Sequence, residues 1–417
     1  MDENSSFNIW TDYPRLPLPE VLDFIVDNRG KTVPTAPTGH KLIATNCIRN
    51  ENLYPSYEKI RYLSEETYQT WFRSHPLPGD IIFVCKGTPG RVCMVPDPID
   101  FCIAQDMVAL RVNKEIIFNR YLLVVLRSEE IQKQIYNYSV GDVIPHFKKS
   151  FFDQLRIPIP PMNIQRRIGD FYFSFSLKIE INNRINQNLE EQAKAIFKSW
   201  FVDFEPFKDG KFVDSELGRI PKGWKTGKFT DVVQILGGGT PKTSIPEYWN
   251  GMIPFFTPKD VSDSIYTFAT EKKLTEDGLN NCNSRLYPEN TVFVTARGTV
   301  GKLALAGVPM AMNQSCYALV GKNVSPLFVF FLALQVVETL KKIANGAVFD
   351  AIVTRDFETK SVIIPPEEAI NRFVELIAPI FKMIHSNVIQ NTTLVQSRDT
   401  LLPKLMSGEI DVFAIKN

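Results

Sequence analysis

The sequence lacks an excess of positive charge, a long apolar run and any paired-cysteine motif. Its 417 residues carry 47 Lys and Arg against 46 Asp and Glu, a formal net charge of +1. Because non-specific attraction to phosphates scales with clustered positive charge, this balance argues against a stand-alone polycationic nucleic-acid binder. The balance does not exclude DNA binding through a local basic cluster. It also does not exclude DNA binding within a complex whose partner supplies part of the positive electrostatic potential.

Other absences narrow the class of protein further. No apolar run reaches the roughly 18 residues of a membrane span, and the acidic, polar start is unlike a signal peptide. The six cysteines form no Cys-x-x-Cys pair, and no two of the four histidines stand at i, i+4 spacing. We therefore expect a cytoplasmic, reduced protein with no membrane segment, disulfide framework or zinc site.

What the sequence does contain is a duplication with a long period. Residues 87–92 (Gly-Thr-Pro-Gly-Arg-Val) match residues 298–303 (Gly-Thr-Val-Gly-Lys-Leu). Further on, residues 141–161 match residues 346–366, and both stretches end in Pro-Pro. The matches keep their order while the offset falls from 211 (87 to 298) to 205 (161 to 366), as small loop insertions would produce. The chain is therefore two copies of one module.

Each copy has an α+β pattern that leads into a long helix. Short β-branched and aromatic runs at 80–84 and 291–294 alternate with Gly and Pro turns, as strands do. Residues 121–136 and 327–343 predict helices. After each Pro-Pro pair, apolar residues recur at alternating steps of three and four, which is the seam of a coiled coil.

Both predicted seams place two asparagines at equivalent positions, Asn182 and Asn186 in one helix and Asn387 and Asn391 in the other. Buried polar seam residues cost stability and fix register, so the match favours pairing of the two helices with each other. An ordinary amphipathic core helix is the alternative. The residues predicted to pair the helices are Ile168, Phe175, Ile179, Asn182, Asn186, Leu189, Phe373, Ile377, Ile380, Ile384, Asn387, Asn391 and Leu394.

These patterns divide the chain into six segments. The two modules are expected at 1–160 and 224–366, and the two long helices at 161–202 and 367–402. A turn-rich linker is expected at 203–223 and a C-terminal tail at 403–417.

No catalytic set can be assembled from the sequence. Residues 298–303 fail as a Walker A phosphate loop, because Ala296 and Leu303 stand where the motif needs Gly and Ser or Thr. Asp260 and Glu271 weakly resemble the motif of a metal-dependent nuclease, but the first copy lacks these acids around Asn46. Two equivalent modules without acid–base or metal groups predict a binding protein and not an enzyme, with no cofactor of its own.

Taken together, the motifs resemble the specificity subunit of type I restriction–modification enzymes. The resemblance covers nearly the whole chain and rests on the duplication, the Ile-Pro-Pro exits into helices and the Gly-Thr-x-Gly turns. Residues 217–224 (Leu-Gly-Arg-Ile-Pro-Lys-Gly-Trp) and 238–242 (Gly-Gly-Thr-Pro-Lys) are similar to the family's entry into its second module. The first copy opens differently, with Asn-Arg-Gly-Lys-Thr at 28–32.

The resemblance implies two similar α/β target recognition domains separated by two long helices that form an antiparallel coiled coil. Each domain would read one half of a bipartite site in double-stranded DNA, and the helices would set the unspecified spacer. Two modification (methyltransferase) subunits would dock on the helices, and restriction (motor–nuclease) subunits would join them. S-adenosylmethionine, ATP and magnesium would belong to those partners.

The Gly-Thr turns and the segments after Gly141 and Gly346 are the predicted DNA-contacting regions. Base readout needs Arg, Lys, Asn or Gln on a loop that enters a groove, and glycine lets the backbone approach closely. The same turns could be purely structural, with solvated charges. The predicted residues are Lys86, Thr88, Arg91, His146, Lys148 and Lys149 in the first copy, and Arg297, Thr299, Lys302, Thr354 and Arg355 in the second.

Two other functions stay open on the sequence alone. A stand-alone DNA methyltransferase or nuclease would require the catalytic set that is missing above. A coiled-coil scaffold would use the helices, and the modules, for partners other than DNA. Duplex binding by the chain together with a modification subunit would separate these possibilities.

Overall fold

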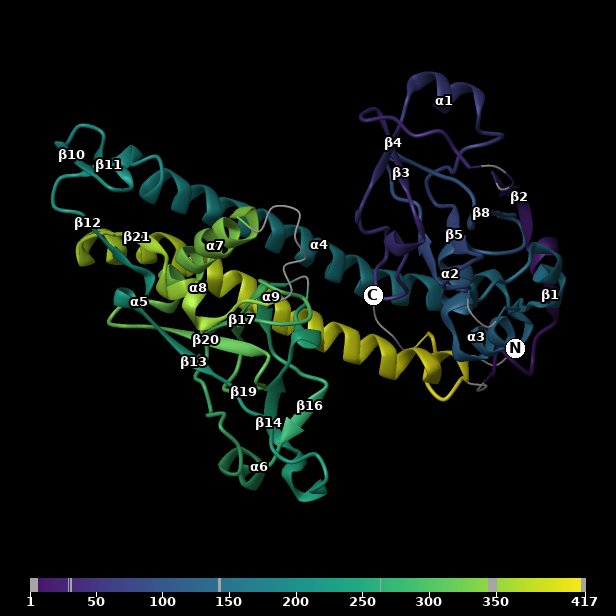
Figure 1. The fold of residues 1–417 in the computed structure, drawn as a ribbon. Coiled ribbons are helices and arrows are strands. Elements are labelled where there is room, and N and C mark those ends of the chain that lie inside the picture. The colour runs from purple at the N-terminus through teal and green to yellow at the C-terminus, as the bar shows by residue number, and fades with distance from the viewer. Residues whose placement is uncertain are drawn as a thin grey trace. The chain divides into compact units, whose positions relative to one another are not determined.

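The computed structural model describes residues 7–28, 30, 32–141, 144–262, 264–343 and 351–413. Two compact units make up the chain: a first unit of residues 1–181 with 391–417, and a second unit of residues 182–390. Two long helices, α4 (Met162–Phe201) and α9 (Glu367–Met406), each contribute residues to both units (Figure 1). The expected fold class, two α+β modules with a pair of long helices, is confirmed.

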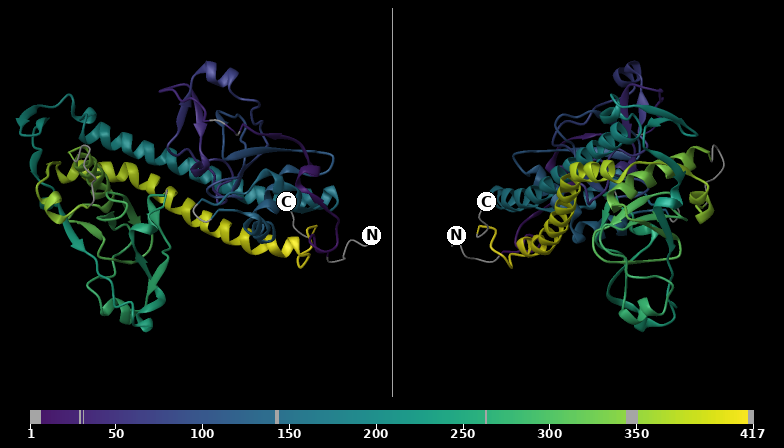
Figure 2. Two further views of the ribbon diagram at one scale, coloured as in Figure 1. Left: turned by 45° about the vertical axis from the view of Figure 1, so that its right-hand side comes forward. Right: turned by 90° about the vertical axis from the view of Figure 1, so that its left-hand side faces the viewer.

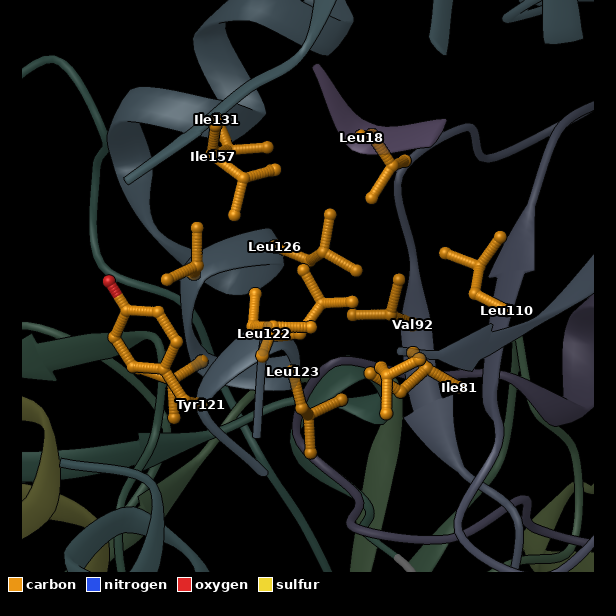
Figure 3. Packing of buried hydrophobic residues seen from close by; sticks show 14 of the residues in the cluster. Leu18, Ile81, Val92, Leu110, Tyr121, Leu122, Leu123, Leu126, Ile131 and Ile157 are labelled. Atoms are coloured by element: carbon orange, nitrogen blue, oxygen red, sulfur yellow. The ribbon is translucent and has the colours of Figure 1, made fainter. Parts of the chain in front are cut away.

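The first unit is built on an antiparallel sheet of order β2-β8-β5-β6. Its central strand β5 is buried along its whole length, because both faces are covered. Ile81 packs in the cluster that includes helix residues such as Leu122 (Figure 3). Phe83 belongs to the same cluster, while Ile82 and Val84 pack in a separate cluster on the other face. The bounds are β2 (Leu22–Val26), β8 (Met107–Val112), β5 (Ile81–Val84), β6 (Val92–Met94), α2 (Asn119–Arg127) and α3 (Glu129–Tyr138).

Smaller elements complete this unit. A three-stranded sheet has the order β4-β3-β7, in which β3 and β7 run parallel. Strand β9, which directly precedes α4 in the chain, pairs with β1. The bounds are β1 (Arg15–Pro17), β3 (His40–Ile43), β4 (Arg61–Leu63), α1 (Glu65–Thr70), β7 (Phe101–Ile103) and β9 (Arg156–Pro158), with short 3-10 helices at Leu18–Val21, Thr45–Cys47 and Lys149–Gln154.

The second unit repeats the order and directions of these strands, with one strand added to the main sheet. Its main sheet has the order β13-β20-β17-β18, extended by β15, and its small sheet has the order β16-β14-β19 with β14 and β19 parallel. The duplication seen in the sequence is therefore a duplication of the fold. The strands are β12 (Lys225–Lys228), β13 (Val233–Gly237), β14 (Trp249–Phe256), β15 (Tyr266–Thr267), β16 (Lys272–Leu274), β17 (Val292–Thr295), β18 (Leu303–Ala306), β19 (Ala311–Met312), β20 (Cys316–Gly321) and β21 (Ser361–Ile364).

Helices also recur at equivalent places in the second unit, and β12 pairs with β21 directly before α9 as β1 pairs with β9 before α4. The helix bounds are α5 (Phe229–Val232), α6 (Glu276–Asn280), α7 (Pro326–Ile343) and α8 (Thr354–Glu358), with 3-10 helices at Glu205–Phe207, Pro246–Tyr248 and Pro258–Asp260. Among the described residues, no helix is both long and apolar enough to cross a membrane.

Within the second unit, α4 and α9 pack side by side in opposite directions (Figure 2). The rings of Phe197 and Phe373 lie 5.7 Å apart. Further along, Nδ2 of Asn387 donates a hydrogen bond to Oδ1 of Asn186 at 2.8 Å. Residue numbers along α9 thus fall as those along α4 rise, which makes the pair antiparallel.

The same pair of helices is tied together in the first unit by a buried cation. Arg398 of α9 donates from Nη1 to Oγ of Ser176 at 3.2 Å and lies over the ring of Tyr172, 4.9 Å from its centroid. Leu405 and Met406, at the end of α9, are buried in the core of this unit.

The buried seam follows the predicted one with two shifts. Phe175 and Ile380 are only half-buried, and their neighbours Ser176 and Phe381 take the buried positions. A straight helix has 3.6 residues per turn, so a seam spaced at 3.5 drifts by about 20° per heptad and the buried face is not confined to strict heptad positions. Of the other predicted seam residues, Ile168, Asn182, Asn186, Phe373, Ile377 and Ile384 are buried, and Ile179, Leu189, Asn387, Asn391 and Leu394 are half-buried.

Three expectations from the sequence differ from the structure. Residues 403–406, expected in the tail, belong to α9, because burial of Leu405 and Met406 outweighs the helix-breaking tendency of Pro403. Within the expected linker, β10 (Phe212–Ser215) and β11 (Gly218–Pro221) form a hairpin. The helix expected at 121–136 is broken at Ser128, whose extended backbone and side chain cap the start of α3.

The Asn186–Asn387 bond provides a test of the helix pairing. Asn387→Ala leaves the buried amide of Asn186 without this partner, so we expect the free energy of unfolding to fall by about 1–3 kcal/mol in chemical denaturation. Replacing both residues with leucine should recover most of that loss, because no buried polar group is left unsatisfied. Asn188→Ala, at an exposed position of α4, is the matched control and should change stability little. Equal effects of Asn387→Ala and Asn188→Ala would contradict the pairing.

Candidate nucleic-acid interface

In the first unit, the Gly-Thr turn connects the two strands β5 and β6. Gly87 and Gly90 have φ angles of +87° and +85°, a backbone region that favours glycine. The amide of Gly90 donates to the carbonyl of Val84 at 3.0 Å and closes the turn. The two glycines are therefore required by the backbone conformation.

The second unit has the same turn at the same place, between β17 and β18. Gly298 and Gly301 have φ angles of +80° and +72°. The amide of Gly301 donates to the carbonyl of Thr295 at 2.8 Å, as Gly90 does to Val84 in the first unit. The predicted contact residues Arg297, Thr299 and Lys302 are exposed on this turn.

The first unit brings the two predicted contact regions together. Lys86 pairs with His146 in an isolated antiparallel bridge, and the amide of Gly87 donates to the carbonyl of Pro145 at 2.9 Å. Lys86, Arg91, Lys148 and Lys149 are exposed, while Thr88 and His146 are half-buried. Lys149 lies 3.4 Å from Oδ2 of Asp27, so its charge is partly neutralised.

An equivalent contact occurs in the second unit. The amide of Ile352 donates to the carbonyl of Ala296 at 2.9 Å, as Phe147 does to Cys85 at 2.8 Å in the first unit. Thr354 and Arg355 then begin α8, with Thr354 half-buried and Arg355 exposed. The repeated motif at 344–347 lies outside the described residues, as do Arg29, Lys31 and Asp142.

Two further basic residues, Lys341 and Lys259, lie at the second turn. The sequence had not indicated either of them as a DNA contact. Nζ of Lys341, on α7, donates to the carbonyl of Gly301 at 2.8 Å. Partial burial, together with repulsion from Lys302, lowers the pKa of Lys341. On the other side, Oγ1 of Thr299 donates to the carbonyl of Pro258 at 3.2 Å, next to the exposed Lys259. These residues are distant in sequence, so no local motif could have indicated them.

Of the two acids that suggested a nuclease, Asp260 has a structural role. Oδ2 of Asp260 accepts from the amide of Thr257 at 2.7 Å, and Oδ1 accepts from the amide of Glu271 at 2.8 Å. Both carboxylate oxygens are thus engaged in capping local backbone. Within the described part of the chain, no group of three or more His, Cys, Asp and Glu is placed to hold a metal ion.

Comparison with known proteins identifies the family of this chain. The sequence matches the type I restriction modification DNA specificity domain twice, over residues 36–191 and 221–393. The chain therefore belongs to this family: it is a type I restriction–modification specificity subunit, a DNA-recognition component and not a catalytic one.

Individual relatives agree with this assignment. The HindI specificity subunit of Haemophilus influenzae is 25% identical over 397 residues, covering 80% of this chain and 86% of that protein. The MjaIX specificity subunit of Methanocaldococcus jannaschii is 28% identical over 341 residues, covering 80% and 78%. Among solved structures, the type I restriction–modification S subunit from M. genitalium aligns over 97% of this chain and 98% of its own with a TM-score of 0.57. At 14% identity, that likeness is one of fold.

The turn geometry makes a prediction for Gly301. A Cβ atom there would lie 2.9 Å from Cγ1 of Val337, and the φ angle of +72° is strained for any L side chain. Gly301→Ala should therefore lower the free energy of unfolding by about 1–3 kcal/mol, measured by denaturation. Gly237→Ala is the matched control, because nothing lies within 4 Å of its Cβ position. A Gly301→Ala protein as stable as the control would show that the turn is not held as described.

Proposed function

We propose that each unit reads one half of a bipartite site in double-stranded DNA, through target recognition domains at 1–160 and 224–366. In this proposal α4 and α9 set the length of the spacer and dock two methyltransferase subunits, which restriction subunits then join. The chain itself supplies no cofactor chemistry. S-adenosylmethionine, ATP and magnesium would be bound by the partner subunits, and the complex would act in the cytoplasm.

One observation carries the proposal: each unit has an equivalent glycine turn at the equivalent place in its main sheet. Each turn follows a buried central strand, β5 or β17, and a backbone hydrogen bond closes it, while its cations are exposed. Such an arrangement suits a loop that enters a groove, because little conformational freedom is lost on binding.

The two turns also differ in a way that predicts different half-sites. Lys86 and Arg91 in the first turn correspond to Arg297 and Lys302 in the second. Arginine can contact guanine O6 and N7 with two parallel hydrogen bonds, whereas lysine acts as a point charge. Exchanging the two cation types between the two ends of the turn changes which end can make that bidentate contact.

The helices carry features that support partner docking. On the second-unit part of the pair, Ile185, Leu376, Met383 and Ile389 have exposed fractions of 38%, 50%, 52% and 45%. In the first unit, a cavity of about 960 Å³ is lined by phenylalanines of α4 and leucines of α9. Apolar surface of this kind on helices is typical of protein–protein contacts and supports methyltransferase docking there.

The test of the proposal is selection from a random duplex library by this chain in complex with its methyltransferase subunit. We expect one asymmetric bipartite sequence with an unspecified spacer, because two non-identical readers are joined in one chain. No methyl transfer is expected from the isolated chain. Enrichment of no bipartite sequence would contradict the proposal, and binding of protein partners alone would favour a scaffold.

The basic residues of the first turn should contribute to DNA affinity and to its salt dependence. Lys86→Ala together with Arg91→Ala removes two exposed cations, so the slope of log affinity against log salt should decrease by about two. Titrations at several salt concentrations measure this slope. Lys133→Ala, an exposed lysine of α3 paired with Glu129, is the control and should leave it unchanged. Equal slopes for all three proteins would exclude these residues from the interface.

A further inference from the structure

Beside the basic turn of the first unit lies a second turn with exposed aliphatic side chains. Val140 and Ile144 have exposed fractions of 41% and 55%. They flank Gly141 and precede His146, the residue that pairs with Lys86. Val140 and Ile144 thus place exposed aliphatic side chains near the cations of the first turn.

Two backbone hydrogen bonds join Val140 to His146. The amide of Val140 donates to the carbonyl of His146 at 2.9 Å, and the amide of His146 donates back to the carbonyl of Val140 at 2.8 Å. Gly141 has a φ angle of +100°, and a Cβ atom there would lie 2.8 Å from the carbonyl oxygen of Ile144. Val140 and His146 are therefore held to each other, and Gly141 lies close to Ile144.

Aromatic packing ties the same turn to the segment that carries the lysines. The ring of Tyr138, immediately before the turn, stacks on Phe151 with centroids 5.8 Å apart. The amide of Phe151 in turn donates to the carbonyl of Lys148 at 2.9 Å. The segment that leads to Val140 is thus packed against the segment that carries Lys148.

Charge complementarity selects the occupant of this surface. The exposed Lys86, Arg91 and Lys148 around it attract a polyanion. In the major groove of DNA, the one apolar group that a base pair offers is the C5-methyl of thymine, and aliphatic side chains contact it. A duplex therefore matches both halves of the surface, cations to phosphates and aliphatic side chains to methyl groups.

We propose that Val140 and Ile144 read thymine in one half-site through contact with its C5-methyl group, while the neighbouring cations hold the phosphates. This inference rests on the proposed function and assigns a base chemistry to one of its two readers.

Replacing thymine with uracil tests the proposal, because uracil lacks only the methyl group. The probe is the duplex selected by the chain with its methyltransferase subunit, with each thymine replaced in turn. For the wild-type protein we expect one position, in one half-site only, where uracil weakens binding about fourfold, the value of one buried methyl group. Ile144→Ser should bind the thymine and uracil duplexes equally at that position.

The control is Leu77→Ser, which changes another exposed aliphatic residue, 51% exposed, four residues before the start of the strand that leads to the Gly-Thr turn. It should keep the wild-type preference for thymine, and thermal melting should show all three proteins folded. If the wild type binds its site but no uracil position weakens binding, or if Ile144→Ser still discriminates, the assignment is wrong. A wild-type protein that selects no bipartite site would instead overturn the proposed function together with this inference.

Discussion

The packing of α4 against α9 is the interaction on which the rest of the structure depends. In the second unit, Ala193 and Phe197 of α4 belong to the same buried cluster as Phe229 and Phe373. In the first unit, Leu405 of α9 is buried in the cluster of that unit's sheet and helices. Each core therefore contains side chains from the helix of the other copy. Neither copy has a complete core without the other, so the duplication forms one interdependent protein and not two independent domains joined by a linker.

This mutual dependence suits a protein that has to recognise two separate sequences as one site. Hydrogen-bonded seam residues such as Asn186 and Asn387 favour a single register over better-packed alternatives. The glycine turns lie at the ends of the central strands β5 and β17, where backbone hydrogen bonds close them. Because the scaffold is the same in both units, the proposed function implies that a change at Lys86 or Arg297 would alter which bases are contacted without altering the fold that presents these residues.

Local patterns in the sequence predicted most of the fold. The runs at 80–84 and 291–294 became the central strands β5 and β17, and the matched asparagines correctly indicated helix pairing. The patterns failed where distant contacts decide: Leu405 extends α9 beyond its expected end through burial in another part of the chain. Likewise, Lys341 reaches the second turn only through the folding of α7 against the sheet, so its place beside Gly301 has no signal in the sequence.

Photo-crosslinking from the two turns is the most direct test of the claim that one fold, used twice, reads two half-sites. A photoreactive amino acid would replace Thr88 in one protein and Thr299 in another, each assembled with the methyltransferase subunit on the selected duplex. The account predicts crosslinks to bases or backbone of one half-site from Thr88 and of the other half-site from Thr299. Crosslinks from both positions to the same half-site, or to neither, would contradict it.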